Sequence, residues 1–286
     1  MFSSDQPSFS VIIPVFNGAA TIEKTLGYLG KQSFTSFEII VVDDGSIDGT
    51  ADVVANCNLE SLRYVFQQRL GVSAARNKGA SMAKGDFLVF LDSDDMVMPE
   101  WLADFSDSLT KSNSELCFCG SSFDFGRGNV SGKENFLAGT FCIKTELFKR
   151  AGGYDERLKH SENTELGWRL IDLNPRVAFV DKVNFRYQRS GRNGLSYLTN
   201  RLEAFEVIKV KHADRFKKNP HLGRTYYQVA AVDACRIGDF EKCKKLMWQG
   251  YWSQPLSFKA LIRALCTVFT PVSELIWKPI KMVYEN

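Results

Sequence analysis

Three carboxylates follow one apolar run in this chain. Phe87 to Leu91 has the pattern of a buried strand, and Asp92, Asp94 and Asp95 come directly after it, the first two forming a DxD. Carboxylates crowded at a strand end repel one another, which favours a cation, and Mg²⁺ or Mn²⁺ bind a few carboxylates together with phosphate oxygens. Either ion would neutralise charge on a departing diphosphate. The alternative is that the aspartates cap the helix near Pro99 or face solvent in a loop.

A second acidic pair follows another apolar run. Val41 and Val42 lead into Asp43 and Asp44, and Gly45 then allows a tight turn. One carboxylate of this pair could accept the N–H of a nucleobase. The alternative is that Asp43 only caps or braces the loop.

A basic residue lies near the start of an expected helix between these two sites. The segment 71–79 carries small residues together with Arg76 and Lys78. Helix N-termini attract phosphate, and an arginine can bind it with two parallel hydrogen bonds. The alternative for Arg76 is a solvated surface side chain.

Short apolar runs alternate with helical patterns over the first 95 residues. Strands are expected at Phe9 to Phe16, Glu38 to Val42, Leu62 to Phe66 and Phe87 to Leu91. Helices are expected at 19–31, 49–55, 73–83 and, farther on, 100–110. Strands separated by helices form parallel sheets, each strand buried on both faces. We therefore predict an α/β fold with an open, mostly parallel sheet flanked by helices, whose strand ends bring the aspartates to one edge.

Composition limits the classes of partner. The 36 basic and 33 acidic side chains give a net charge of +3, so we expect no nucleic-acid partner. Seven cysteines without CxxC spacing indicate reduced thiols. The N-terminus lacks the charged and apolar regions of a secretory signal, and no run approaches the ~18 apolar residues of a membrane span. We therefore expect a cytoplasmic protein.

Four segments resemble glycosyltransferase family 2 in order and register: SVIIPVFNG, EIIVVDDGSIDGT, GVSAARNKGA and KGDFLVFLDSDD. The resemblance is close over residues 8–100, looser to about residue 190, and fades beyond. It implies a GT-A fold, which is Rossmann-like, an inverting mechanism, a nucleoside-diphosphate sugar donor of the UDP class, and Mn²⁺ or Mg²⁺. The site residues that it implies are Asp44 with Asp43 for the nucleobase, Pro14, Val15 and Phe16 for its pocket, Arg76 for the nucleotide, and Asp92 and Asp94 for ribose and metal.

The expected catalytic base departs from the family pattern. Family members usually carry Glu-Asp before the stretch that reads TELGWRL here, with the aspartate as base, whereas this chain has Glu162 and Asn163. A carboxamide cannot take the proton of an attacking hydroxyl. Glu162 and Glu165 are the candidates, and we expect Glu162 because it lies nearer the usual position. The alternative is that both glutamates only favour the first turn of a helix at 165–171.

The acceptor side is assigned to residues near this base. Gly152 to Glu156 is expected to form a turn that includes Tyr154 and Asp155, and Trp168 follows in the expected helix. Aromatic faces suit the C–H surface of a sugar, so Tyr154 and Trp168 could stack on the acceptor. Packing in the core is the alternative for both rings.

The predicted organisation is a catalytic domain at 1–195, with a nucleotide-binding half at 1–100 and an acceptor half at 101–195, and a helical extension at 196–286. The C-terminal 254–284 segment is amphipathic and basic. Such helices can lie on a membrane surface, here the inner face, and would suit a lipid-linked acceptor. The alternative is packing on the helical extension or on a second copy in a homodimer.

The sequence therefore predicts an inverting glycosyltransferase that acts on a glycan or lipid-linked hydroxyl in polysaccharide synthesis. A nucleotidyltransferase is a rival, but it would open with a glycine- and lysine-rich phosphate loop, which residues 14–18 do not form. A second rival is a catalytically idle member that binds nucleotide or glycan, because Asn163 replaces the expected acid.

Overall fold

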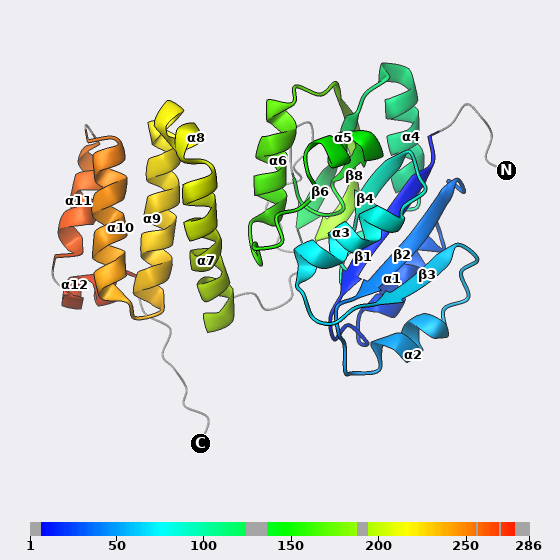
Figure 1. Cartoon of the computed structure of the whole chain (residues 1–286), viewed down its shortest axis with the longest axis horizontal. Coiled ribbons are helices and arrows are strands. Elements are labelled where there is room, and N and C mark those ends of the chain that lie inside the picture. The colour runs from blue at the N-terminus through cyan, green and yellow to red at the C-terminus, as the bar shows by residue number, and fades with distance from the viewer. Residues whose placement is uncertain (1–6, 124–135, 188–193, 256, 269, 278–286) are drawn as a thin grey trace. The chain divides into compact units, whose positions relative to one another are not determined.

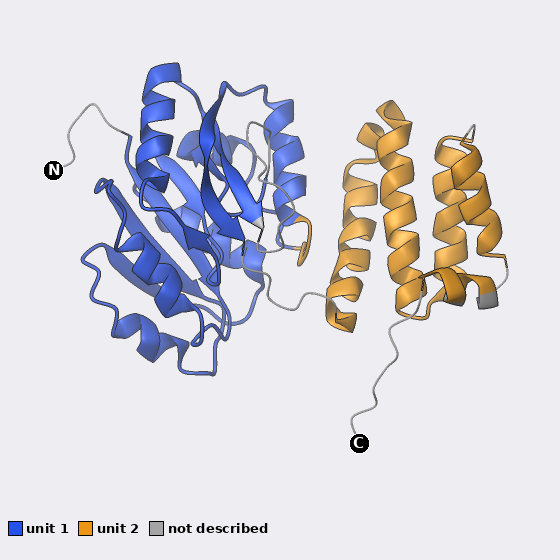
Figure 2. Cartoon of the chain, turned by 180° about the vertical axis from the view of Figure 1, so that it is seen from behind, with its two compact units in different colours: residues 1–156, 162–190 blue, residues 157–161, 191–286 orange. Residues whose placement is uncertain are grey.

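The computed structural model describes residues 7–123, 136–187, 194–255, 257–268 and 270–277. The chain forms two compact units (Figure 2): residues 1–156 with 162–190, and residues 157–161 with 191–286. The assignment of catalysis to residues 1–195 and of an accessory role to 196–286 stays a prediction.

The first unit contains a mixed sheet (Figure 1). Its strands among the described residues are β1 Phe9–Val15, β2 Phe37–Asp43, β3 Leu62–Phe66, β4 Phe87–Phe90, β5 Met96–Val97, β6 Leu116–Phe123, β7 Phe141–Lys144 and β8 Val177–Tyr187. They are ordered β3-β2-β1-β4-β7-β6-β8-β5. The first four strands in chain order pair in parallel, as does β6 with β8, whereas β7 runs antiparallel to both its neighbours. The predicted α/β fold with flanking helices is confirmed, but the sheet mixes both directions.

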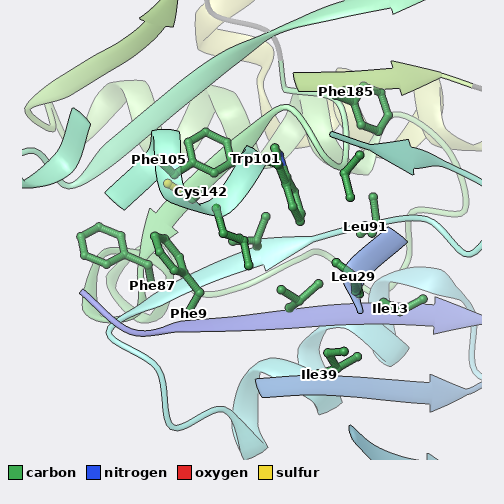
Figure 3. Packing of buried hydrophobic residues seen from close by; sticks show 14 of the residues in the cluster. Phe9, Ile13, Leu29, Ile39, Phe87, Leu91, Trp101, Phe105, Cys142 and Phe185 are labelled. Atoms are coloured by element: carbon green, nitrogen blue, oxygen red, sulfur yellow. The ribbon is translucent and has the colours of Figure 1, made fainter. Parts of the chain in front are cut away.

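Alternating side chains of the sheet build two cores. On β1, Val11 and Ile13 enter one core and Ile12 the other, because successive strand residues point to opposite faces. The helices of this unit are α1 Ile22–Leu29, α2 Thr50–Ala55, α3 Val72–Met82, α4 Trp101–Ser112, α5 Thr145–Arg150 and α6 Glu162–Asp172. Buried residues of α1, α2 and α4 share the first core, part of which Figure 3 shows around Trp101, and those of α5 and α6 share the second with Ala80 of α3.

Helix α3 lies very close to the sheet. A Cβ added at Gly79 would come within 2.5 Å of the Ile12 side chain, so only glycine allows this approach. The close packing fixes α3, and with it Arg76, against β1.

Strand β3 departs from the expected double burial. It forms an edge of the sheet, and Tyr64 and Phe66 are exposed. Strand β6 continues to Phe123, and residues 124–135 lie outside the described part.

The second unit is helical, as expected for the C-terminal region. Its described helices are α7 Leu195–Lys211, α8 Ala213–Lys218, α9 Pro220–Arg236, α10 Phe240–Ser253, α11 Phe258–Cys266 and α12 Thr270–Trp277. Side-chain caps begin three of them: Asn219 accepts from Leu222 N, Asp239 from Lys242 N, and Ser257 from Ala260 N. In the part of the chain described here, no helix combines the length and hydropathy that crossing a bilayer requires.

Phe90→Ala should strongly destabilise the first unit. Phe90 is fully buried and packs on Phe148 and Tyr154, with centroid distances of 5.3 and 5.0 Å. Loss of this ring should lower the free energy of unfolding by about 3–5 kcal/mol in a urea titration. Phe66→Ala, on the exposed edge strand, serves as control and should cost under about 1 kcal/mol. Equal costs would contradict the core assignment.

Candidate active site

The carboxyl ends of β2, β1 and β4 lie side by side at one edge of the sheet. The three strands are neighbours and parallel, so Asp43 and Asp44, Phe16, and Asp92 are carried to the same edge. Ligands of parallel sheets bind at this kind of edge. The sequence-based expectation about where the polar residues gather therefore agrees with the backbone arrangement.

Arg76 is the centre of this edge. Its Nη2 donates to Asp92 Oδ1 at 2.7 Å and its Nη1 donates to Glu162 Oε1 at 2.8 Å. Arg76 is 1% exposed, so its guanidinium is shielded from water, whereas the two carboxylates are partly exposed. One guanidinium thus joins the acidic turn after β4 to the first residue of α6.

The protonated state of Arg76 is secured by its neighbours. Burial favours the neutral form, but the carboxylates of Asp92 and Glu162 outweigh it, so the pKa of Arg76 is raised above its already high ordinary value. Its Nε is buried and has no acceptor among the described residues. The arginine expected to contact a nucleotide is here bound by protein carboxylates.

Glu162 is held from two sides through one oxygen. Both Arg76 Nη1 and Asn163 Nδ2, at 2.8 and 3.1 Å, donate to its Oε1. Asn163 in turn accepts from the Tyr154 hydroxyl at 2.8 Å. Both hydrogen bonds to Glu162 end on Oε1, so Oε2 accepts none from the described residues. This second oxygen can take a proton.

Glu165 has different surroundings from Glu162. It is fully buried, and Arg169 donates to it from Nε at 2.9 Å and from Nη2 at 2.6 Å. Arg169 also donates to the carbonyl of Ala151, which ties α6 to the end of α5. Glu165 therefore acts in this structure as one half of a buried ion pair.

Asp44 organises the loop before α3. Its Oδ1 accepts from Gln67 Nε2 and Leu70 N, and its Oδ2 accepts from Gly71 N, each at 2.8 Å. A carboxylate offers about four lone-pair positions, so one remains for a further donor such as a nucleobase N–H.

Asp43 is also bound within the protein. Its Oδ1 accepts from Ser46 N at 2.7 Å, and its Oδ2 accepts from the Tyr64 hydroxyl at 2.6 Å. Although Tyr64 is 37% exposed, partial desolvation of the hydroxyl, reinforced by its bond to Asp43, raises the pKa of Tyr64, so the hydroxyl stays protonated and remains a donor. Asp43 is nearly inaccessible and braces the turn at Gly45.

Phe16 is the exposed member of the expected pocket-lining trio. Pro14 and Val15 are buried in β1, whereas Phe16 is partly exposed. The guanidinium carbon of Arg69 lies 3.8 Å from the centroid of its ring, which is a cation–π contact. Sequence reasoning missed Arg69, because nothing in its local pattern indicates that it folds over Phe16.

The acidic turn after β4 is held in place by a hydrogen bond within its backbone and by a side chain of α1. Asp95 N donates to Asp92 O at 3.2 Å, and the Thr25 hydroxyl of α1 lies 3.0 and 3.1 Å from the carbonyls of Ser93 and Asp95. Asp92 and Asp94 are partly exposed, whereas Asp95 is buried. Thr25 was not predicted, since its sequence pattern is that of an ordinary helix residue.

No cluster of three or more His, Cys, Asp or Glu side chains suited to a metal is present among the described residues. Two accessible carboxylates fit an ion that takes its remaining ligands from a diphosphate and water, which is the usual habit of Mg²⁺. The donor set of Asp92 and Asp94 is therefore suited to a hard divalent cation that arrives with its substrate.

The three expected acceptor-side residues differ in accessibility. Tyr154 is buried in the second core, between Phe90 and Phe148, so its ring faces are covered. Burial is the main cause of its raised pKa, which keeps its hydroxyl a donor to Asn163. Asp155 and Trp168 are partly exposed.

Asn77 positions the turn that carries Tyr154, and the sequence analysis did not identify it. Its Oδ1 accepts from Tyr154 N at 2.8 Å, and its Nδ2 donates to Tyr154 O and Glu156 Oε1, both at 2.9 Å. The residue next to Arg76 thus fixes the segment that leads to Glu162. Its position beside Arg76 on α3 was the signal available.

Gly153→Ala should destabilise the site more than Gly152→Ala. Both glycines have positive φ, 69° and 82°. An added Cβ would meet Asn77 Oδ1 at 2.8 Å from Gly153, but only Arg169 Nη1 at 4.0 Å from Gly152. Gly152→Ala should cost about 1–2 kcal/mol for its backbone, and Gly153→Ala at least about 1 kcal/mol more. Urea titrations measure the free energy of unfolding of both variants. Equal losses would contradict the close approach of Asn77 to Gly153.

Two relatives among the known glycosyltransferases each match about a third of the chain. Validoxylamine A glucosyltransferase of Streptomyces hygroscopicus subsp. jinggangensis is 42% identical over 105 residues, 35% of this chain and 25% of that protein. The amylovoran biosynthesis glycosyltransferase AmsB of Erwinia amylovora is 39% identical over 102 residues, 34% of this chain and 33% of that protein. The matches therefore span a quarter to a third of the length of these relatives.

Solved structures share the fold over nearly the whole chain. S. aureus TarS 1-349 in complex with UDP-GlcNAc has a TM-score of 0.61 at 20% identity, over 93% of this chain and 90% of that one. Mannosyltransferase PcManGT of Pyrobaculum calidifontis, in complex with GDP-Man and Mn²⁺, has a TM-score of 0.60 at 18% identity, over 95% and 87%. The family model described as glycosyl transferase family 2 matches residues 10–165, more than half of the chain. The chain belongs to glycosyl transferase family 2.

Proposed function

We propose that this chain transfers a sugar from a UDP-sugar to a hydroxyl of a glycan or lipid-linked acceptor, with inversion, in polysaccharide synthesis. Family membership supports the reaction class. The donor class is supported by a structural neighbour in complex with UDP-GlcNAc and the pathway by a relative named for amylovoran biosynthesis.

The ion pairs of Arg76 carry the proposal. A transferase that inverts needs a carboxylate at the donor and a base at the acceptor, close to each other. Asp92 and Glu162 both lie within hydrogen-bond distance of one buried guanidinium, at 2.7 and 2.8 Å. Because Arg76 is buried and bound to both carboxylates, it holds the donor side and the acceptor side at a fixed distance from each other.

Glu162 is the proposed base. Its Oε2 takes the proton of the acceptor hydroxyl as that oxygen attacks the anomeric carbon of the donor sugar. The bond from this carbon to the diphosphate breaks, and its electron pair leaves with the diphosphate. Attack opposite the leaving group inverts the anomeric centre. Glu165 is the weaker candidate, since both its oxygens are bound by Arg169.

Asp92 and Asp94 are proposed to hold Mn²⁺ or Mg²⁺. A divalent cation there would stabilise the negative charge that develops on the diphosphate. Asp44 is the proposed acceptor of the nucleobase N–H through its remaining lone pair, next to the Phe16 ring. Asp43 would support Asp44 from the turn. Trp168 and Asp155 are proposed on the acceptor side, whereas the covered ring of Tyr154 supports Asn163 instead.

Asp94→Ala should weaken metal-dependent donor binding. Calorimetry with UDP and UDP-sugars should show tighter binding with Mn²⁺ than without it, and the variant should lose at least about tenfold of that affinity. Asp107→Ala, which removes an exposed carboxylate of α4, is the control and should bind as the wild type does. Absence of binding to every nucleotide sugar would contradict the proposed donor site.

Glu162→Gln should abolish transfer and spare donor binding. The amide oxygen still accepts from Arg76, but the side chain cannot take a proton, so kcat should fall by about 10²–10⁴ while UDP affinity stays unchanged. Most of the activity retained would refute the base assignment. Normal donor binding by a wild type without transfer to any acceptor would favour the idle alternative.

Asn163→Asp should move the acid limb of the kcat profile to higher pH. It places a second carboxylate beside Glu162, and two like charges at this distance raise the pKa of the pair, so the base form needs a higher pH. Asn163→Ala removes the hydrogen bond from Asn163 Nδ2 to Glu162 but adds no charge, so it should move the limb upward by less than Asn163→Asp does. Unchanged profiles in both variants would mean that Glu162 is not the group that titrates.

A further inference from the structure

Helix α11 exposes large apolar side chains, whereas a helix that only packs on its own unit would bury them. Ala260, Ala264 and Thr267, at i, i+4 and i+7, are buried. Phe258, Ile262 and Leu265 have the same spacing on another face and are 74%, 45% and 49% exposed. We call these three residues the α11 face. Small side chains face the core and large apolar ones face outward.

The α11 face lies at the end of a row of helices. Within the helical unit, α9 packs on α7 and α10, and α11 packs on α10 (Figure 1). No described residue of this helical unit covers the α11 face. Further exposed apolar side chains are present on α10 and α12 and after α11: Trp252, Val268, Val272, Leu275 and Ile276. An apolar surface of this extent indicates an interaction site.

Charge in the second unit is far from the balance of the whole chain. Residues 191–286 carry 16 lysines and arginines against 8 aspartates and glutamates. The excess of basic residues is hidden in the net charge of +3 because the rest of the chain is acidic. The net charge of the whole chain therefore does not describe the charge of this unit.

Basic side chains also flank the α11 face itself. Lys259 and Arg263 are exposed and lie one position after Phe258 and Ile262, along one side of the apolar stripe. Helix α11 contains no acidic residue. An apolar stripe bordered by cations matches the boundary between the headgroups and the acyl chains of an anionic bilayer.

We propose that the α11 face binds the surface of an anionic lipid bilayer, with Phe258, Ile262 and Leu265 entering the interface and Lys259 and Arg263 contacting lipid phosphates. A second copy of the chain fits less well. A two-fold interface brings the same patch of both copies together, so the basic flanks would face each other without an acidic partner on α11. The inference does not rest on the proposed enzymatic function.

The test is sedimentation of the full chain with vesicles that contain phosphatidylglycerol and with vesicles of phosphatidylcholine alone. The wild type should bind the anionic vesicles more tightly, and added salt should weaken that binding. The double change Ile262→Asn with Leu265→Asn should weaken binding by about tenfold or more, because two apolar side chains no longer enter the interface. Val210→Asn, which alters an exposed apolar residue of α7, is the matched control and should bind normally.

Charge reversal separates a local site from general attraction. Lys259→Glu with Arg263→Glu should weaken binding by at least about tenfold. Lys217→Glu with Lys218→Glu makes the same change of net charge on α8 and should have a clearly smaller effect. Equal losses in both pairs would overturn the proposal in favour of unspecific attraction by the basic unit.

Self-association is the other outcome that would overturn it. If the wild type ignores both kinds of vesicle and forms a dimer that Ile262→Asn with Leu265→Asn dissociates in analytical ultracentrifugation, the α11 face binds a second copy. Circular dichroism melts should agree between each variant and its control, since all changed residues are exposed.

Discussion

The buried guanidinium of Arg76 is the constraint on which the rest of the site depends. A charge without water is costly unless carboxylates surround it, and two of them do, from different parts of the chain. Gly79 brings α3 against β1, Thr25 pins the acidic turn, and Asn77 fixes the segment before α6. Each of these contacts serves to keep one of the three charged groups in place.

Much of the fold could be predicted because its first half follows simple patterns. Leu62–Phe66 was predicted with its observed bounds, and α3 and α4 within one or two residues, since long periodic runs identify an element well. Strand β7, Phe141–Lys144, was not assigned, because its three apolar residues followed by a lysine fit a strand or a buried helix equally. Its antiparallel pairing is a tertiary property and leaves no local signal.

The types of the site residues could be predicted, whereas their partners could not. Arg76 is 16 residues from Asp92 and 86 from Glu162 along the chain, so no spacing rule relates them. Glu162 and Glu165 both fit a helix start, and only packing separates them: one turns to Arg76, the other to Arg169. The net charge of the whole chain did not reveal the basic second unit for a similar reason. A total cannot show that basic residues gather in one part of the structure.

The hydrogen bonds of Asn77 to Tyr154 and Glu156 affect how the chain folds. Residues 71–77 and 153–163 are far apart along the chain, and contacts between such segments form slowly because the loop between them must first be closed. The ion pair between Arg76 and Glu162 and the three hydrogen bonds of Asn77 join the same two segments, so they form a cooperative group. The region around Glu162 should therefore be among the last parts to become native, and partial opening there would displace the proposed base while leaving the proposed nucleotide-binding strands folded.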